Sequence, residues 1–327
     1  MNSFGRIFRL SIFGESHGQI IGTVIDGCPP GIPIKEKDFK KDLERRKPKS
    51  IASTPRLEND VISIKSGIFK GYSTGAPILI QFENKNIISK DYNTTKQIPR
   101  PGHSDFVAEK KYLGYNDYRG AGMFSGRLTL PLVAAGVIAK KIIKPITIHS
   151  KIISIGGQKK YKKILEEIIK SGDSIGGIVQ CKASNMPIGL GEPFFDTLES
   201  ILSHLIFAIP GIKAIEFGAG FKAAEMKGSQ FNDPIINQYG KTLTNHSGGI
   251  NAGISNGNDL LFKVAVRPTA SISIEQKTFN FQKNKIDKLK IKGRHDCCIA
   301  LRIPVILEAV TAIVLADLTL IDKTLKL

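Results

Sequence analysis

Residues 100–105, Arg-Pro-Gly-His-Ser-Asp, place a fixed cation, a titratable imidazole and a carboxylate around a Pro-Gly turn. Arginine keeps its positive charge throughout the physiological pH range, whereas histidine changes charge near neutrality. Because Pro-Gly favours a turn, Arg100, His103 and Asp105 are expected to lie close together. The stretch therefore indicates a site that holds an acidic small molecule and moves a proton. A surface turn followed by a helix capped at Ser104 is the alternative.

Further arginines and a second histidine occur at the ends of predicted elements or in turns, where side chains from distant segments can meet. Such a set suits a ligand with several carboxylate or phosphate groups, because each guanidinium can make a bidentate, charge-assisted contact. His17, His103 and Asp296 supply acid–base capacity. Spacing alone does not show that these side chains converge. The candidate anion-binding residues are Arg45, Arg46, Arg100, Arg127 and Arg294.

The hydrophobic pattern predicts a mixed fold. Alternating or β-branched runs predict strands at 3–13, 20–26, 61–69, 77–82, 146–155, 174–184, 212–217 and 260–266. Helical spacing predicts helices at 34–46, 104–115, 128–143, 197–209 and 305–320, with a lysine-rich helix before residue 174. No linker or composition break divides the chain. We therefore expect one α+β domain over residues 1–327, with helices packed on antiparallel sheets.

A glycine-rich loop at 117–127 leads into one of these helices. Free backbone N–H groups point outward at a helix N-terminus, so the loop is a second candidate anion site. The sequence Gly-Ala-Gly-Phe-Lys-Ala at 218–223 fits a loose dinucleotide fingerprint, but it is followed by only a short helical stretch before Gly228 and lacks a ribose-binding acid, which favours a turn.

The net charge of +18 raises the alternative of a nucleic-acid-binding protein. The lysines are spread along the chain, and no stretch interleaves aromatic with basic residues, so specific nucleic-acid binding is not favoured.

His295, Cys297 and Cys298 are too close in sequence to complete a zinc site, and no serine-hydrolase elbow is present. The cysteine pattern indicates reduced thiols, and Glu308 and Asp317 interrupt the apolar stretches. We therefore expect a cytoplasmic protein without a membrane span.

Taken together and in order, several motifs resemble those of the chorismate synthase family. They include Phe-Gly-Glu-Ser-His-Gly at 13–18, Asp-Gly-Cys-Pro-Pro-Gly at 26–31, the stretch at 100–105 and Gly-Arg-His-Asp at 293–296. Three others agree: Asp-Tyr-Arg-Gly at 117–120, Asn-His-Ser-Gly-Gly at 245–249 and Arg-Pro-Thr-Ala-Ser-Ile at 267–272. The matches run from near the N-terminus to the C-terminal helix.

The resemblance implies a reaction and a fold. The family converts 5-enolpyruvylshikimate 3-phosphate to chorismate and phosphate by a trans 1,4-elimination, in the shikimate pathway of aromatic amino acid biosynthesis. Reduced FMN is required and not consumed; NADPH serves only indirectly, for flavin reduction. The implied fold is a β-α-β sandwich with large antiparallel sheets, assembled as a homotetramer. An oxidoreductase that consumes its flavin is a further alternative.

The resemblance also assigns roles to residues. The five arginines named above would hold substrate anions, with Arg294 also meeting the flavin. His103 would stabilise the reduced, anionic flavin, His17 would protonate the departing phosphate or its flavin-side partner, and Asp296 would assist removal of the ring proton. Asp105 is expected to matter less than Asp296. The other flavin contacts would be Met123, Phe124, Ser125, Ala252, Arg267, Pro268, Thr269, Ala270 and Ser271.

The chain departs from the family pattern at several positions. Met123 stands where a polar residue is common, Ala252 where glycine is common, and Cys297 where proline is usual. An arginine that is common in the family shortly after the helix that ends at Arg46 has no clear equivalent at Ile51–Ala52. This last departure predicts that the protein depends on a separate flavin reductase instead of reducing its own flavin with NADPH.

Overall fold

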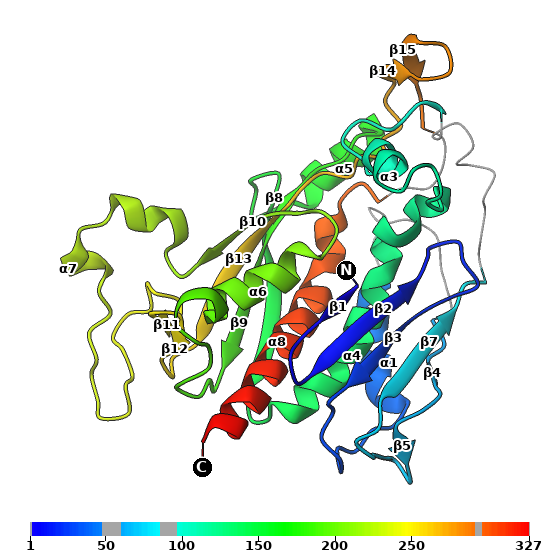
Figure 1. The fold of residues 1–327 in the computed structure, drawn as a ribbon. Helices are drawn as coiled ribbons and strands as arrows, with labels where there is room; N and C mark the ends of the chain where they lie inside the picture. Colours follow the sequence, from blue (N-terminus) through cyan, green and yellow to red (C-terminus); the bar gives the residue numbers. More distant parts are fainter. Residues whose placement is uncertain (1, 48–59, 86–96, 292–295, 327) are drawn as a thin grey trace.

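Two antiparallel sheets enclose a layer of long helices in this computed structural model, which describes residues 2–47, 60–85, 97–291 and 296–326 (Figure 1). Helix α4 (Thr129–Ile142) packs against the first sheet and α8 (Ile303–Leu325) against the second, and the two helices pack on each other. The predicted α+β sandwich is confirmed. Because one helical layer forms the core for both sheets, we infer that the chain is a single domain.

The first sheet comes from the N-terminal part of the chain and has the order β1-β2-β3-β7-β4. In its β2–β3 hairpin, Arg9 lies opposite Asp26 and Gly14 opposite Ile21, so the turn that carries His17 is at one end of the sheet. The single strands predicted at 3–13 and 61–69 are each broken in two. The strands are β1 (Ser3–Phe4), β2 (Arg9–Gly14), β3 (Ile20–Asp26), β4 (Ser63–Ile64) and β7 (Ile78–Glu83).

The second sheet has the order β10-β13-β9-β8, and all four of its strands were predicted within a few residues. Alternate residues of β13 and β9 are buried, which is the pattern expected when one face of a sheet covers a core. The strands are β8 (Thr147–Ile155), β9 (Gly177–Ser184), β10 (Ile212–Phe217) and β13 (Leu260–Val266).

The central helices approach each other closely. A Cβ atom at Gly136 of α4 would lie 2.4 Å from Ala309 Cβ of α8, so glycine is required for this contact. With the 3₁₀ turns that precede them, these helices form the stretches Arg119–Ile142 and Ile299–Leu325, which are long and apolar enough to span a membrane by length and composition. Most of each apolar stretch is buried inside the protein, as in core helices. Two further helices flank them: α1 (Lys37–Arg46) and α6 (Leu198–Phe207).

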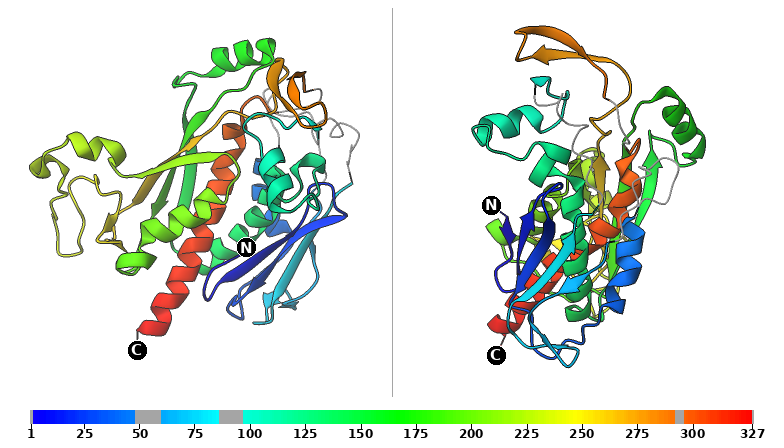
Figure 2. Two further views of the ribbon diagram at one scale, coloured as in Figure 1. Left: turned by 45° about the horizontal axis from the view of Figure 1, so that its top comes forward. Right: turned by 90° about the vertical axis from the view of Figure 1, so that its right-hand side faces the viewer.

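Smaller elements decorate this frame. The helix predicted at 104–115 ends at Lys111, because Leu113 and Gly114 adopt left-handed backbone conformations with φ of 55° and 81°. The hairpin β14–β15, which projects from the top of the molecule, was not predicted (Figure 2). The remaining elements are β5 (Ile68–Phe69), β6 (Tyr72–Ser73), α3 (Asp105–Lys111), α5 (Lys162–Ser171), α7 (Gly228–Phe231), β11 (Ile250–Asn251), β12 (Ile254–Ser255), β14 (Gln276–Asn280) and β15 (Lys285–Leu289).

Short 3₁₀ turns complete the description: η2 (Arg119–Phe124), η3 (Gly126–Leu128), η4 (Phe194–Asp196), η5 (Gly220–Glu225) and η6 (Ile299–Arg302). The η5 turn occupies the glycine motif at 218–223. A dinucleotide-binding helix is therefore absent at this described position, as the sequence analysis expected.

Buried Asp317 of α8 explains why the first predicted strand is interrupted. Its carboxylate accepts hydrogen bonds from the backbone N–H groups of Arg6, Ile7 and Phe8, at 2.9, 2.7 and 2.9 Å. These N–H groups are thereby withdrawn from the strand ladder, and the N-terminal segment is fixed to the central helix. Asp317, which interrupts an apolar run in the sequence, thus connects the N-terminal segment to helix α8 by hydrogen bonds.

Replacing Asp317 with asparagine is expected to destabilise the fold by about 2–3 kcal/mol, because an amide N–H would then face backbone N–H groups that have lost an acceptor. Urea unfolding followed by far-UV circular dichroism measures the change. Asp322→Asn is the matched control: Asp322 lies on the same helix and pairs with Lys326 at the surface, so its loss is expected to stay within about 0.5 kcal/mol. Equal effects of the two substitutions would contradict the assignment.

Candidate active site

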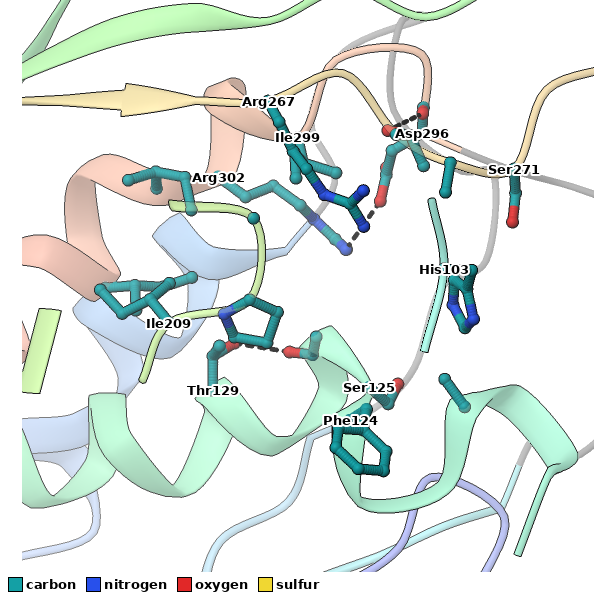
Figure 3. A pocket seen from close by; sticks show the side chains of 18 of the residues that line it. His103, Phe124, Ser125, Thr129, Ile209, Arg267, Ser271, Asp296, Ile299 and Arg302 are labelled. Atoms are coloured by element: carbon teal, nitrogen blue, oxygen red, sulfur yellow. Dashed lines mark hydrogen bonds and ion pairs between the residues drawn. The ribbon is translucent and has the colours of Figure 1, made fainter. Parts of the chain in front are cut away.

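A cavity of about 250 Å³ opens where the C-terminal end of α1 meets the N-terminal ends of α4 and α8 (Figure 3). Four loops complete its wall: residues 100–103 before α3, residues 120–126, residues 209–211 after α6, and residues 267–271 after β13. The loops at 100–103, 120–126 and 267–271 contain motifs described above. Each of the three helix ends contains such a motif or lies beside one. The fold therefore brings together segments that are far apart in the sequence.

Among the described residues, four arginines line this cavity: Arg46, Arg100, Arg267 and Arg302. Arg46 is buried and donates from Nε to Thr129 Oγ1 at 3.1 Å. Asp296 is the lining carboxylate, and Arg302 Nη1 lies 3.3 Å from its Oδ2. Arg46 and Arg100 also pair with Asp60 and Asp105 behind the wall. The four arginines still outnumber these three carboxylates, so the cavity carries an excess of positive charge and suits a ligand with several anionic groups.

Arg100 and His103 share one carboxylate. Arg100 is buried and donates from Nε and Nη2 to the two oxygens of Asp105, both at 2.7 Å. His103 Nδ1 lies 2.7 Å from Asp105 Oδ1. Burial lowers the pKa of His103, as do the nearby positive charges of Arg100 and Arg267, and Asp105 opposes this shift. His103 is therefore neutral at neutral pH in the unliganded site.

The loop after β13 connects the arginine cluster to Asp296. Arg267 Nη1 donates to the carbonyl of Gly102 at 2.5 Å, and Ser271 Oγ accepts from Arg100 Nη1 at 3.0 Å. Thr269 Oγ1 donates to the backbone carbonyl of Asp296 at 2.8 Å. Ala270 lines the cavity together with Thr269 and Ser271, whereas Pro268 does not. The guanidinium of Arg267 and the hydroxyl of Ser271, which accepts from Arg100 and keeps its own O–H, form a donor set that fits a phosphate group.

His17 lies directly behind the cavity wall. It is buried in the β2–β3 turn, and a Cβ atom at Gly120 would lie 2.6 Å from His17 Cδ2 and 2.7 Å from Nε2. Gly120 lines the cavity and has φ of 57°. Only glycine therefore allows the wall to approach the histidine this closely. The predicted catalytic histidine is thus one backbone thickness from the cavity.

Gly120→Ala is expected to lower turnover about 100-fold, because the new methyl group displaces His17 from its position next to the wall. The steady-state rate of phosphate release, in the reaction that the family resemblance implies, measures this effect. Gly157→Ala provides the control for backbone strain, since Gly157 has φ of 78° and nothing lies within 4 Å of its added Cβ. Comparable turnover in the Gly120 variant and wild type would show that the position of His17 does not matter.

Arg127 is buried close to this wall without lining the cavity. It donates from Nε to Asn84 Oδ1 at 3.1 Å and forms an ion pair with Asp60. Asn84 Nδ2 in turn donates to the carbonyls of Glu15 and Gly18, at 3.0 and 2.9 Å. Arg127 is therefore linked to both ends of the turn that carries His17.

Several predicted site residues lie elsewhere. Arg45 forms a bidentate pair with Glu308 on α8, at 2.6 and 2.7 Å, and does not line the cavity. Phe124 and Ser125 line the cavity, whereas Met123 lines a separate one formed with the N-terminal strands. Ala252 lies in the β11–β12 turn with φ of 50°. Arg294 falls outside the described residues.

Ala252 and the cavity lie at opposite ends of helix α6. The adjoining Gly253 would place a Cβ 2.5 Å from Thr197, which caps the N-terminal end of α6. The cavity instead contacts Ile209 to Gly211, just beyond the other end of this ten-residue helix. The helix length alone puts roughly 15 Å between the two places.

Comparison with known proteins identifies the family. The family model for chorismate synthase matches residues 8–320. The chain belongs to the chorismate synthase family. It is 56% identical over 324 residues to the chorismate synthase of Chitinophaga pinensis, covering 99% of this chain and 98% of that protein. The chorismate synthase of Pyrococcus abyssi is 44% identical over 341 residues, covering 96% of each chain.

A solved structure agrees. A crystal structure of chorismate synthase superposes with a TM-score of 0.75 and 25% identity, over 98% of this chain and 93% of that one. Chorismate synthase is a carbon–oxygen lyase of the shikimate pathway, which turns 5-enolpyruvylshikimate 3-phosphate into chorismate and phosphate. The arginine-lined cavity is the candidate site for such a polyanionic substrate.

The structure shows what holds Asp296 in this member of the family, which has Cys297 instead of proline. The carbonyl of Cys297 accepts from Ile175 N at 2.8 Å, and that of Asp296 accepts from Thr269. These bonds fix the backbone on either side of the position where proline would restrict it. Burial and the negative charge of Asp296 raise the pKa of the Cys297 thiol, so it is not an activated nucleophile.

Proposed function

We propose that this chain is an active chorismate synthase that binds 5-enolpyruvylshikimate 3-phosphate together with reduced FMN in the arginine-lined cavity. The observation that carries the proposal is the convergence of Arg46, Arg100, Arg267 and Arg302 on a cavity that also contains His103 and Asp296. The substrate has two carboxylates and a phosphate, and FMN adds a second phosphate. Guanidinium groups from separate segments match this distribution of charge.

The donor set fits FMN. Arg267 and Ser271 would hold its phosphate at the wall that Thr269 also lines, while the Thr269 hydroxyl stays bonded to Asp296, and Phe124 adds an apolar surface at the opposite wall (Figure 3). Bound reduced FMN would supply an electron to the substrate and recover it, so that no net oxidation occurs. The remaining arginines are then available for the substrate anions.

The chain's own acids and bases account for the proton movements. In the 1,4-elimination a C–O bond to phosphate and a C–H bond break, and a proton and phosphate leave. We assign Asp296 to the ring proton, because its carboxylate lines the cavity beside Arg302. His103 would face the reduced flavin, and His17 would protonate the departing phosphate from behind Gly120. Acid–base groups of this kind contribute about 10²–10⁴ to turnover.

An anaerobic assay tests the function. Chemically reduced FMN and substrate should yield chorismate and phosphate, with the flavin still reduced after many turnovers. A folded protein that gives no chorismate, or that oxidises one flavin per turnover, would overturn the proposal. Replacing reduced FMN by FMN plus NADPH should give no turnover until a flavin reductase is added, in keeping with the sequence near Ile51, which lies outside the described residues.

We further propose a homotetramer in the cytoplasm. Several large aromatic side chains are bare in the single chain: Phe194, Phe195 and Phe221 are 86%, 90% and 82% exposed. Exposed apolar groups of this size favour burial by a partner. Ala252 is too far from the cavity of its own chain to contact a flavin there. A flavin contact by Ala252 would therefore need the cavity of a neighbouring subunit. Light scattering should give four times the chain mass. The free cysteines fit a reducing compartment.

A further inference from the structure

Asp105 contacts both His103 and Arg100, and the proposed function gives it no role. Its side chain is only 9% exposed and is the common partner of both residues. One oxygen contacts His103 Nδ1 and Arg100 Nη2, and the other accepts from Arg100 Nε at 2.7 Å and from its backbone N–H at 3.1 Å. Three residues of one tight turn are thereby held in a single arrangement.

We propose that Asp105 is a positioning residue for the reaction, which fixes the proton of neutral His103 on Nδ1 and leaves Nε2 as the nitrogen that exchanges a proton in the cavity. This inference rests on the proposed function. An ionised carboxylate only accepts hydrogen bonds, so the imidazole nitrogen 2.7 Å away must carry the hydrogen. The same carboxylate aligns the fork of Arg100, so the cation and the imidazole cannot reorient independently.

The charges around His103 determine what this arrangement does. Its own turn contributes Arg100 and Asp105, and the loop after β13 contributes Arg267, whose guanidinium reaches Gly102. The same cavity wall includes Arg46 from α1, and Asp296 and Arg302 from the segment before α8. Burial lowers the pKa of His103, and the charges of Arg100 and Arg267 lower it further against the effect of Asp105, so the unliganded imidazole is neutral. Cations outnumber carboxylates in this set.

Binding of an anion reverses this balance. Negative charge in the cavity favours the imidazolium, so the pKa of His103 rises and a proton is taken up. Because Nδ1 already carries a hydrogen, the new proton can enter only at Nε2. Asp105 therefore determines the atom at which ligand binding places a proton, and the reverse step returns it from the same atom.

The substitution Asp105→Asn changes this without removing volume. The asparagine oxygen is expected to keep the position that accepts from both Nε and the backbone N–H of Arg100, and the amide N–H₂ then takes the position that faces His103 Nδ1. Nδ1 must accept, so the hydrogen of the neutral ring moves to Nε2. The negative charge that raises the pKa of His103 is also lost, and this pKa falls further below its ordinary value.

Nitrogen-15 NMR of histidine-labelled protein, without flavin or substrate, provides the decisive measurement. His103→Gln identifies the signal. Wild type should show the Nδ1–H tautomer and the Asp105→Asn variant the Nε2–H tautomer. Adding inorganic phosphate should raise the pKa of His103 in both proteins. The pKa reached in the variant should be lower than that reached in wild type. The same tautomer in both proteins, or no response to phosphate, would overturn the inference.

Kinetics connect the contact to the reaction. Asp105→Asn should lower kcat about 10- to 100-fold, as is typical when the partner that orients a functional histidine is lost. Asp105→Glu should restore part of it, and serves also if the asparagine variant does not fold. Asp26→Asn is the control, because Asp26 accepts from Arg9 and a backbone N–H at the opposite end of the β2–β3 hairpin; its kcat should match wild type. Unchanged kcat in Asp105→Asn would refute the positioning role. A wild type with the Nδ1–H tautomer but no turnover would instead refute the proposed function.

Discussion

Replacing His103 with alanine is expected to lower kcat by a factor of about 10²–10⁴. The ring is held by Asp105, faces the cavity between Arg100 and Arg267, and is kept neutral by burial and these cations. Alanine removes the group that takes up a proton when negative charge enters, so the anionic form of the reduced flavin loses its partner. Stopped-flow measurement of chorismate formation under anaerobic conditions, with flavin saturating, separates this loss from weakened flavin binding.

The matched substitution is His149→Ala. His149 is exposed on β8 and does not line the cavity. Its replacement therefore removes one histidine, as His103→Ala does, but leaves the site unchanged. Its kcat should stay within about twofold of wild type, the range expected for a surface substitution. A His103→Ala enzyme that retains more than a tenth of wild-type kcat would remove His103 from the list of acid–base groups, even if flavin binding is unchanged.

Arg45 and Arg46 show where prediction from sequence stops. Both were predicted at the last turn of α1, correctly, from hydrophobic spacing and the favourable position of cations there. Consecutive residues on a helix point about 100° apart, so the two cannot have the same surroundings. Arg46 reaches the cavity, whereas Arg45 pairs with Glu308. Which of the two faces the site depends on how α1 packs against α4 and α8, and that information is not local.

The strands and central helices were predictable because each carries its own periodic pattern over many residues. Short elements were not: the interruption after β1 depends on Asp317, more than 300 positions away. His17 illustrates the same limit at the site. Its turn could be found from glycine punctuation, but its place behind Gly120 follows from packing of the β2–β3 turn against a loop a hundred residues later. Local signals locate candidates, and only the fold decides which of them meet.

Arg302 is a charged residue of the site that sequence reasoning missed. It follows Asp296 by six residues, outside any motif selected, at the start of a long apolar helix. In the structure it lines the cavity, and Nη1 lies near Asp296. Among the described residues its Nε is buried without a hydrogen-bond partner. A buried donor of this kind is costly unless a ligand satisfies it, which makes Arg302 a strong candidate for a substrate anion.

Arg302→Met is therefore expected to lower kcat/KM about 10²–10³-fold, the usual effect of removing one preorganised donor from a site where charge is stabilised. Methionine keeps most of the side-chain volume, so helix α8 and its core are preserved. Arg302→Lys should recover only part of the loss, because lysine restores the charge without the planar pair of donors. Steady-state kinetics and the affinity for inorganic phosphate, measured by calorimetry, should both weaken in the order wild type, lysine, methionine.

The control for this series is Arg9→Met, which removes an exposed arginine paired with Asp26 at the far end of the β2–β3 hairpin. It lowers the net charge of the protein by the same amount as Arg302→Met, so it corrects for the general attraction of a basic protein for anions. If both methionine variants weakened phosphate binding equally, the effect of Arg302 would be that of net charge. A loss confined to the Arg302 variants would instead require a specific contact, since salt screens long-range attraction much more than a partly buried guanidinium–anion contact.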